Sequence, residues 1–150
     1  MMIEPTTDKE QIKEIITEPK LWAMTYGQGC LIEQFEVDLN NYYYSIIHDK
    51  QVIGLFETKP FNKITLDAHI YILPKYQDGQ LSVKAVKAGQ EYFKENTDIH
   101  NIITTVPVSC SYVHRFLSKT DFKATGQISD GIIYNDQLQN LIIYQLKIRG

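Results

Sequence analysis

The stretch AHIYILPKYQDGQLSVKAVKAGQEYF, residues 68–93, most constrains what this chain can fold into. It begins with the residues of a β-strand and breaks at Pro74, which cannot donate a hydrogen bond to a sheet. A polar loop follows, and from Ser82 to Asn96 apolar residues recur at spacings of three and four, which predicts an amphipathic helix. Main-chain amides in such a strand–loop–helix connection can bind phosphate, so residues 77–80 are a candidate phosphate site. The alternative is a turn that binds no ligand.

The rest of the chain predicts one α+β (mixed α/β) sheet. The expected order of elements, β α α β β β α β α β β, combines antiparallel hairpins with one strand–helix–strand crossover. A chain of 150 residues is expected to form a single domain, residues 1–150. Helices are expected at residues 6–19, 20–27, 82–96 and 111–119, and strands at 3–6, 42–49, 52–61, 63–74, 100–108 and on both sides of a turn at 135–137 within 131–148.

Charge and composition exclude several classes of protein. The net charge of −3 gives no general attraction to nucleic acid or to an anionic membrane. No apolar run approaches the ~20 residues of a membrane span, and the N-terminal MMIEPTTDKE lacks the features of a secretory signal. The two cysteines form neither a disulfide framework nor a zinc site. We therefore expect a cytoplasmic protein without a metal ion.

The strand–loop–helix stretch resembles the signature of the GCN5-related N-acetyltransferase (GNAT) superfamily. That signature is a strand ending in an apolar-x-Pro step, then Arg or Gln, two residues, Gly, one residue, and Gly or Ala. Here residues 72–74 match the strand end and Gln77 matches the Arg/Gln position. Gln80 stands at the central Gly position, Ser82 at the Gly/Ala position, and Gly79 comes one residue early. A side chain at the central position hinders close approach of the backbone to a phosphate.

The resemblance covers nearly the whole chain and implies a fold, an activity and a binding site. The fold would be a mostly antiparallel twisted sheet of six to seven strands with about four helices. The activity would be transfer of an acetyl group from acetyl-CoA, the co-substrate, to an amine on a small molecule or a protein. The resemblance implies that the cofactor diphosphate binds the loop and that the pantetheine arm binds the main chain of two strands. The implied residues are Gln77, Asp78, Gly79, Gln80, Leu81 and Ser82 in the loop, and Tyr71, Ile72, Leu73, Thr105 and Val106 in the strands.

A later segment, VPVSCSYVHRFLSKTDFKATG, is similar to a second family pattern, a strand followed by a helix ending in Tyr-x-x-x-Gly-Phe. Phe122 occupies the aromatic position, Asp121 replaces the Gly, and Leu117 replaces the Tyr. That Tyr commonly protonates the departing thiolate of coenzyme A, and leucine cannot donate a proton. The second hypothesis is therefore a protein that keeps the fold for binding or assembly and has lost the transfer reaction.

Several short motifs are also similar to the GNAT-related proteins of tailed bacteriophages. They are residues 69–74, the Val-Pro step at 106–107, and the Arg-Phe-Leu run at 115–117. Several relatives of this kind are associated with virion assembly. This resemblance implies a virion or host protein as partner and a location in the host cytoplasm or the virion. The apolar final strands are also compatible with a homodimer.

An acetyltransferase needs a base that takes a proton from the attacking amine. Asp67 and His69 alternate with apolar residues of the third predicted long strand, so they share one face of it. Glu57, near the end of the preceding strand, is the third candidate. His69 suits the role best, because histidine ordinarily titrates near neutral pH. The alternatives are a histidine on a solvated sheet face, and a bulge that exchanges the two faces.

Overall fold

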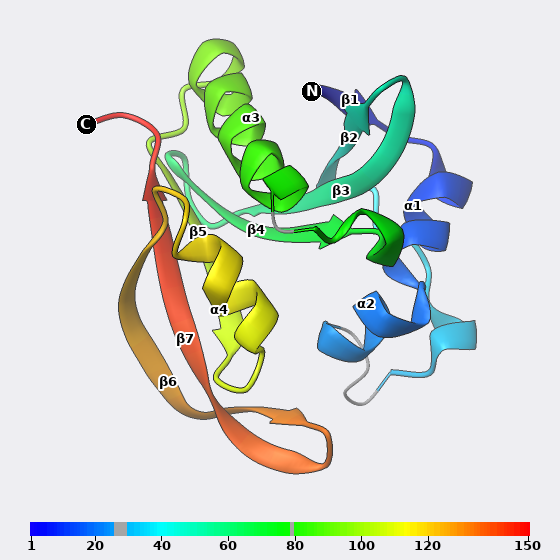
Figure 1. Ribbon diagram of the computed structural model, residues 1–150, viewed down its shortest axis with the longest axis vertical. Helices are drawn as coiled ribbons and strands as arrows, with labels where there is room; N and C mark the ends of the chain where they lie inside the picture. The colour runs from blue at the N-terminus through cyan, green and yellow to red at the C-terminus, as the bar shows by residue number, and fades with distance from the viewer. Residues whose placement is uncertain (26–29, 79) are drawn as a thin grey trace.

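The structure is a computed structural model that describes residues 1–25, 30–78 and 80–150. Within these ranges seven strands form one sheet, in the order β1-β2-β3-β4-β5-β7-β6 (Figure 1). Every neighbouring pair is antiparallel except β4 and β5. The α+β class and the mostly antiparallel sheet of six to seven strands are confirmed. The strands are β1 (Met2–Thr6), β2 (Tyr42–His48), β3 (Gln51–Pro60), β4 (Thr65–Ile72), β5 (Asn101–Pro107), β6 (Lys123–Tyr134) and β7 (Gln137–Lys147).

The first two helices begin where the sequence places capping residues. In the first helix, the Asp8 side chain accepts a hydrogen bond from the amide of Gln11. In the second, which begins at Pro19, the Glu18 side chain accepts from the amides of Lys20 and Leu21. In the described part of the chain, no helix is long and apolar enough to cross a bilayer. The α-helices are α1 (Lys9–Ile16), α2 (Pro19–Met24), α3 (Gln80–Asn96) and α4 (Ser111–Leu117), with short 3-10 helices η1 (Ile32–Gln34) and η2 (Pro74–Tyr76).

The four α-helices cover both faces of the sheet (Figure 1). On one face, α3 and α4 bury apolar side chains that include Val86, Phe93 and Leu117 against β4, β5 and β7. The opposite face carries α1 and α2. Its core consists of Ile12, Ile15, Ile16, Leu21 and Trp22 from the helices with Tyr43, Leu55 and Tyr71 from the strands.

The parallel pair β4 and β5 stays together for only a short distance. Its register joins Thr65, Leu66 and Asp67 to residues 101–103, and no pairing between the two strands continues beyond Asp67. From that point β4 pairs only with β3, whereas β5 pairs with β7 as far as Pro107. The two strands therefore part in the middle of the sheet.

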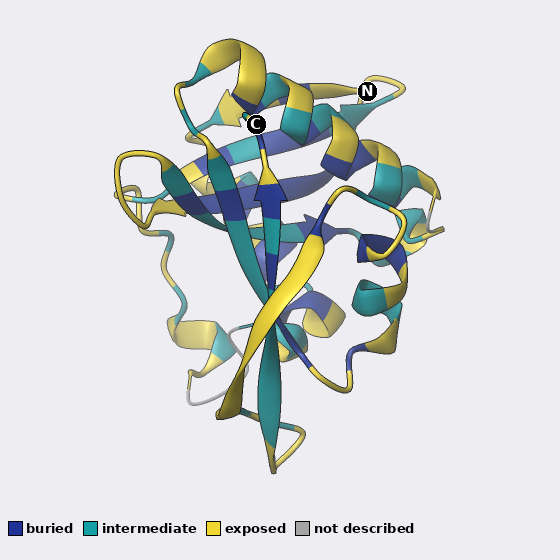
Figure 2. Ribbon diagram, turned by 90° about the vertical axis from the view of Figure 1, so that its left-hand side faces the viewer, coloured by how far each residue is buried: buried dark blue, intermediate teal, exposed yellow. Residues whose placement is uncertain are grey.

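The strand β6 is longer than the sequence predicts. The apolar pattern placed its start near Gly131, whereas the strand begins at Lys123. Residues 123–131 are all exposed at the edge of the sheet, so they show no alternation of apolar and polar side chains (Figure 2). The pairing with β7 is also irregular between Ile128 and Ile132, where Asp130 has a φ of 49°.

Candidate active site at the parting of two strands

A cavity of about 280 Å³ opens where β4 and β5 part, on the face of the sheet that carries α2. All three residues proposed as bases line it, together with Met24 and Thr25 at the end of α2. We call it the polar cavity. Its polar and charged lining residues are Glu57, Lys59, Asp67, His69, Thr25, Thr104 and Thr105.

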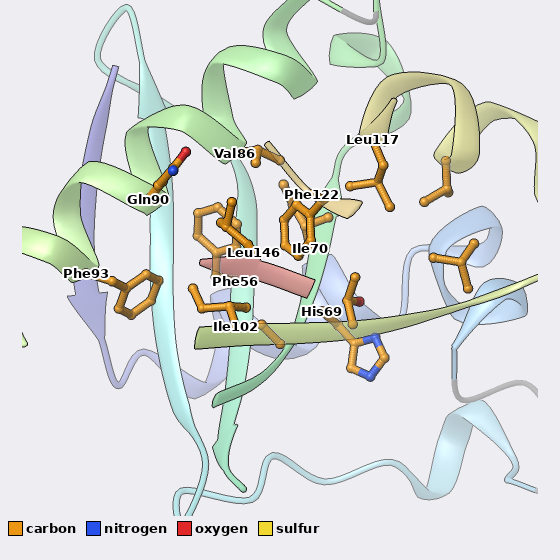
Figure 3. A pocket seen from close by; sticks show the side chains of 15 residues that line it. Phe56, His69, Ile70, Val86, Gln90, Phe93, Ile102, Leu117, Phe122 and Leu146 are labelled. Atoms are coloured by element: carbon orange, nitrogen blue, oxygen red, sulfur yellow. The ribbon is translucent and has the colours of Figure 1, made fainter. Parts of the chain in front are cut away.

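The antiparallel pairing of β3 with β4 places these side chains on one face. Glu57 is paired with His69, and Lys59 with Asp67. The register runs without a break from Gly54 to Pro60, so no bulge exchanges the faces. Figure 3 shows the imidazole of His69 pointing away from the apolar side chains of β3 and α3. The structure thus brings the three predicted bases into one cavity.

Glu57 is held by the hydroxyl groups of two tyrosines; the sequence analysis assigned Tyr71 to the site only through its main chain and did not assign Tyr43. The Tyr71 hydroxyl lies 3.0 Å from Oε1 of Glu57, and the Tyr43 hydroxyl lies 3.3 Å from Oε2. The Glu57 residue is only 2% exposed. Burial, reinforced by the negative charge of Glu57, raises the pKa of Tyr43 to about 12. This cluster places a hydrogen-bonded carboxyl group beneath the cavity.

The loop before α3 uses its amides within the chain. The amide of Gln77 donates to Pro74 and that of Asp78 donates to Tyr76, at 3.2 and 3.0 Å. Those of Gln80 and Leu81 both donate to Asp78, to its carbonyl and its carboxylate, each at 2.8 Å. Gly79 lies outside the described residues. The Asp78 carboxylate therefore occupies the helix start at which the sequence analysis placed a diphosphate.

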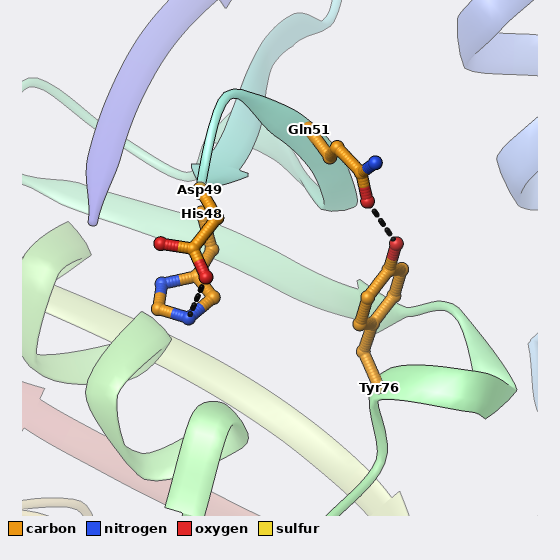
Figure 4. A network of polar contacts seen from close by, with 4 residues as sticks. All are labelled: His48, Asp49, Gln51 and Tyr76. Atoms are coloured by element: carbon orange, nitrogen blue, oxygen red, sulfur yellow. Dashed lines mark hydrogen bonds and ion pairs between the residues drawn. The ribbon is translucent and has the colours of Figure 1, made fainter.

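Side chains also fix the loop to its surroundings. The Gln77 amide group donates to the carbonyl of Ile72 at 2.7 Å. The Tyr76 hydroxyl donates to Gln51 of β3 at 2.7 Å, beside the His48–Asp49 pair of the β2–β3 turn (Figure 4). Ser82 is fully buried, and its hydroxyl lies 2.8 Å from that of Tyr112 in α4.

The main chain of β4 faces two ways after the strands part. The amide of Leu73 donates to Ile53 of β3 at 2.9 Å. The carbonyl oxygen of Tyr71 also faces β3, where a Cβ atom at Gly54 would lie 2.1 Å from it. Because successive peptide groups of a strand point to opposite sides, those of Ile70 and Ile72 are directed toward β5. Of the three contacts predicted on the β4 side, Tyr71, Ile72 and Leu73, Ile72 alone thus has its main chain directed toward β5, and its carbonyl already accepts from the Gln77 side chain.

A second cavity of about 40 Å³ lies on the other face of the sheet, between β4, β5, α3 and α4 (Figure 3). We call it the apolar cavity. Phe56, Phe93, Leu117 and Phe122 form much of its wall. Five residues line both cavities, which therefore meet where the strands part; they are His69, Ile70, Thr104, Val106 and Val113.

The helix α4 does not supply the tyrosine of the family pattern. Leu117 is 2% exposed and contributes to the wall of the apolar cavity. His114 connects α4 to the sheet, since its Nε2 lies 2.9 Å from the Pro107 carbonyl and its Nδ1 lies 2.5 Å from the Tyr144 hydroxyl. A carbonyl only accepts, so Nε2 donates to Pro107. Both ring nitrogens are engaged by these contacts, which favours a structural role for His114.

The sequence matches the family described as "Protein of unknown function (DUF2824)" over residues 8–149. Comparison with curated proteins found no match. Among solved structures, the chain is similar to spermidine N-acetyltransferase from Vibrio cholerae in complex with CoA and spermine, with a TM-score of 0.81 and 14% identity over 97% of this chain and 94% of that one. A chimera of this enzyme with hSSAT gives a TM-score of 0.80 and 15% identity over 99% and 97% of the two chains.

A further structure, spermidine/spermine N-acetyltransferase SpeG from Vibrio cholerae with manganese ions, matches 74% of this chain and 67% of that chain. Its TM-score is 0.65 at 18% identity. Such similarity at low identity shows a common fold, and the predicted fold is confirmed. The resemblance to the phage-encoded subgroup stays a prediction.

Proposed function

The chain belongs to the DUF2824 family and has the GNAT fold, and from these premises we propose that it is an acyl-CoA-dependent N-acyltransferase acting on an amine. The observation that carries the proposal is the parting of β4 and β5 after Asp67, with a cavity on each face of the sheet and five lining residues in common. A scaffold without a ligand gains nothing from separating two strands in the middle of its sheet, because main-chain groups there lose hydrogen-bond partners.

The parting suits the extended pantetheine arm and its acyl group. The main chain of Ile70 and the amide of Ile72 point into it from β4, whereas the Ile72 carbonyl accepts from Gln77. Thr105 and Val106 lie along its other side. An extended chain can pair with such main-chain groups as an added strand does. When bound, acetyl-CoA supplies an acyl group that is activated as a thioester.

The polar cavity suits the amine. Transfer forms a bond between the amine nitrogen and the acyl carbon and breaks the carbon–sulfur bond. One proton must leave the amine, and another must reach the thiolate. His69 is the proposed base, because its imidazole lies in the polar cavity and also lines the apolar one. Asp67 and Glu57 outnumber the single cation of the lining, Lys59, so the cavity keeps a net negative charge, and the two carboxyl groups are the alternative bases. A comparison structure holds spermine, a polyamine, which supports an amine as acceptor.

Two observations favour a second candidate, a binding or assembly protein without transfer activity. The Asp78 carboxylate accepts from the amide of Leu81 and the Asp78 carbonyl accepts from that of Gln80, so a diphosphate would have to displace Asp78 from both. Leu117 cannot protonate the thiolate. Solvent can also protonate a thiolate, so the absence of a tyrosine at position 117 does not exclude transfer. We give the polar cavity with its three candidate bases more weight than these two observations. A virion or host partner and a homodimer remain predictions.

Titration with acetyl-CoA tests the proposal. A ligand that binds only the folded protein must raise its Tm. We expect a rise at millimolar acetyl-CoA, and mass spectrometry should detect an acetylated product when spermidine is added. A rise in Tm without a product from any amine would select the binding protein. Absence of a rise would reject both coenzyme A binding and acyl transfer.

A further inference from the structure

We propose that the apolar cavity receives the acyl chain of the donor and selects a short uncharged acyl group longer than acetyl. This inference rests on the proposed function, because it concerns the same parting of β4 and β5. It identifies the class of donor that the chain would use, which the similarity of fold leaves open.

The lining of the apolar cavity matches a hydrocarbon chain. Outside His69, Gln90 and Thr104, every lining residue is apolar or glycine. None of the lining side chains carries a fixed charge at neutral pH. A carboxylate at the end of an acyl chain would therefore lose its hydration here without gaining a charged partner.

The size of the apolar cavity limits the length of the acyl chain that it can hold. A cavity of 150 Å³ is known to accept benzene, so about 40 Å³ corresponds to roughly two carbon atoms. Acetyl places one carbon beyond its carbonyl group, propionyl places two and butyryl places three. The wall is closely packed, since a Cβ atom at Gly89 would lie 2.8 Å from the Phe56 ring. The volume thus holds the two carbons of propionyl and favours propionyl over acetyl and over longer chains.

The two cavities offer the donor chain and the amine different surroundings. Both open at the parting where the thioester carbonyl would lie between β4 and β5. An acyl chain gains by leaving water for the apolar cavity, whereas an amine gains by meeting Glu57 and Asp67 in the polar one. The sheet therefore separates the apolar part of the donor from the polar acceptor.

Calorimetry tests the proposal by measuring how tightly the unmodified protein binds coenzyme A and five of its thioesters. The thioesters are acetyl-, propionyl-, butyryl-, succinyl- and octanoyl-CoA. Each methylene that enters the cavity should tighten binding about fourfold. We expect propionyl-CoA to bind about fourfold more tightly than acetyl-CoA, and octanoyl-CoA to lose this gain. Succinyl-CoA has the four carbons of butyryl-CoA and an added charge, and it should bind at least about tenfold more weakly than butyryl-CoA.

Equal affinity for all the thioesters, or tight binding of succinyl-CoA, would overturn the acyl assignment and leave the proposed function standing. Failure of coenzyme A and every thioester to bind would overturn both. These outcomes separate the two claims without any measurement of turnover.

Substitutions in the wall of the apolar cavity then test whether the acyl chain binds there. Ala68→Val adds two carbon atoms to the wall of the apolar cavity and should abolish the preference for propionyl over acetyl. Ile102→Val removes one carbon from the wall and should move the preference toward butyryl. The matched control is Ala88→Val, since Ala88 packs against a different core cluster and does not line the cavity. An unchanged preference in both cavity variants, or an equal shift in the control, would overturn the assignment.

Discussion

The hydroxyl of Tyr71 in β4 lies 3.0 Å from Oε1 of Glu57 in β3, beneath the polar cavity. On the other side of the same carboxyl group, the hydroxyl of Tyr43 in β2 lies 3.3 Å from Oε2. A buried carboxylate requires such donors, because it has been removed from water. Three adjacent strands are thus linked through one side chain at the floor of the candidate site.

Removal of one hydroxyl donor should destabilise the protein measurably. We expect Tyr71→Phe to lower the free energy of unfolding by about 1.5–3 kcal/mol, as is typical of a hydrogen bond to a charged group. Tyr43→Phe should cost less, because its bond to Glu57 is longer. Urea denaturation of the two variants and the parent protein measures both effects. Unchanged midpoints in both variants would show that the hydroxyls do not stabilise Glu57.

The same cluster predicts a dependence of stability on alkaline pH. Tyr43 has its pKa raised to about 12, so the folded protein holds this proton more tightly than the unfolded chain, whose tyrosines titrate near 10. The stabilisation is complete below pH ~10 and is lost as the pH rises toward about 12. We expect Tyr43→Phe to lose less stability than the parent protein over this interval. Denaturation midpoints at pH 8, 10 and 11 provide the comparison, and parallel curves would contradict it.

Replacement of His69 should affect turnover more than binding. If His69 takes the proton from the amine, His69→Ala should lower kcat by about 10²–10⁴-fold with little change in the dissociation constant for acetyl-CoA. His48→Ala is the matched control, since His48 pairs with Asp49 at the β2–β3 turn and lines neither cavity. Full activity in His69→Ala would transfer the role to Asp67 or Glu57.

The charge of Asp78 should oppose binding of a diphosphate. Asp78→Asn keeps a side-chain oxygen that can accept from the amide of Leu81 and removes the negative charge at the start of α3. We expect this variant to bind coenzyme A more tightly than the parent protein, by a factor that shrinks as salt is added. Asp78→Ala removes the cap as well and should cost about 1 kcal/mol of stability. Weaker binding by Asp78→Asn would place the diphosphate elsewhere.

Local patterns predicted most of the fold. The alternation in β4 placed Asp67 and His69 on one face, and that face lines the polar cavity. The turn predicted at residues 135–137 joins β6 to β7, and it contains Asn135 and Asp136 with positive φ. These features depend on neighbours in the sequence, so one chain is enough to show them.

Features that depend on distant contacts were not predictable in the same way. The apolar pattern of β5 is the same whether or not β4 stays beside it, so the parting after Asp67 has no local signal. The contact of Glu57 with Tyr71 likewise requires the register between two strands. The role of Asp78 did have a signal, since an aspartate three residues before Leu81 at a helix start is typical of a cap.

Hydrogen exchange should report the parting of the strands directly. The amides of Ile70 and Ile72 point toward β5 at a place where the two strands are not paired, whereas the amide of Leu73 donates to Ile53 in β3. We expect the first two amides to exchange rapidly in the free protein and to become protected when acetyl-CoA is added, because the pantetheine arm would then accept from them. The amide of Leu73 should be protected in both states and serves as the internal control. Equal protection of Ile70 and Leu73 in the free protein would mean that β4 and β5 are paired in solution, and the proposed donor site would then be closed.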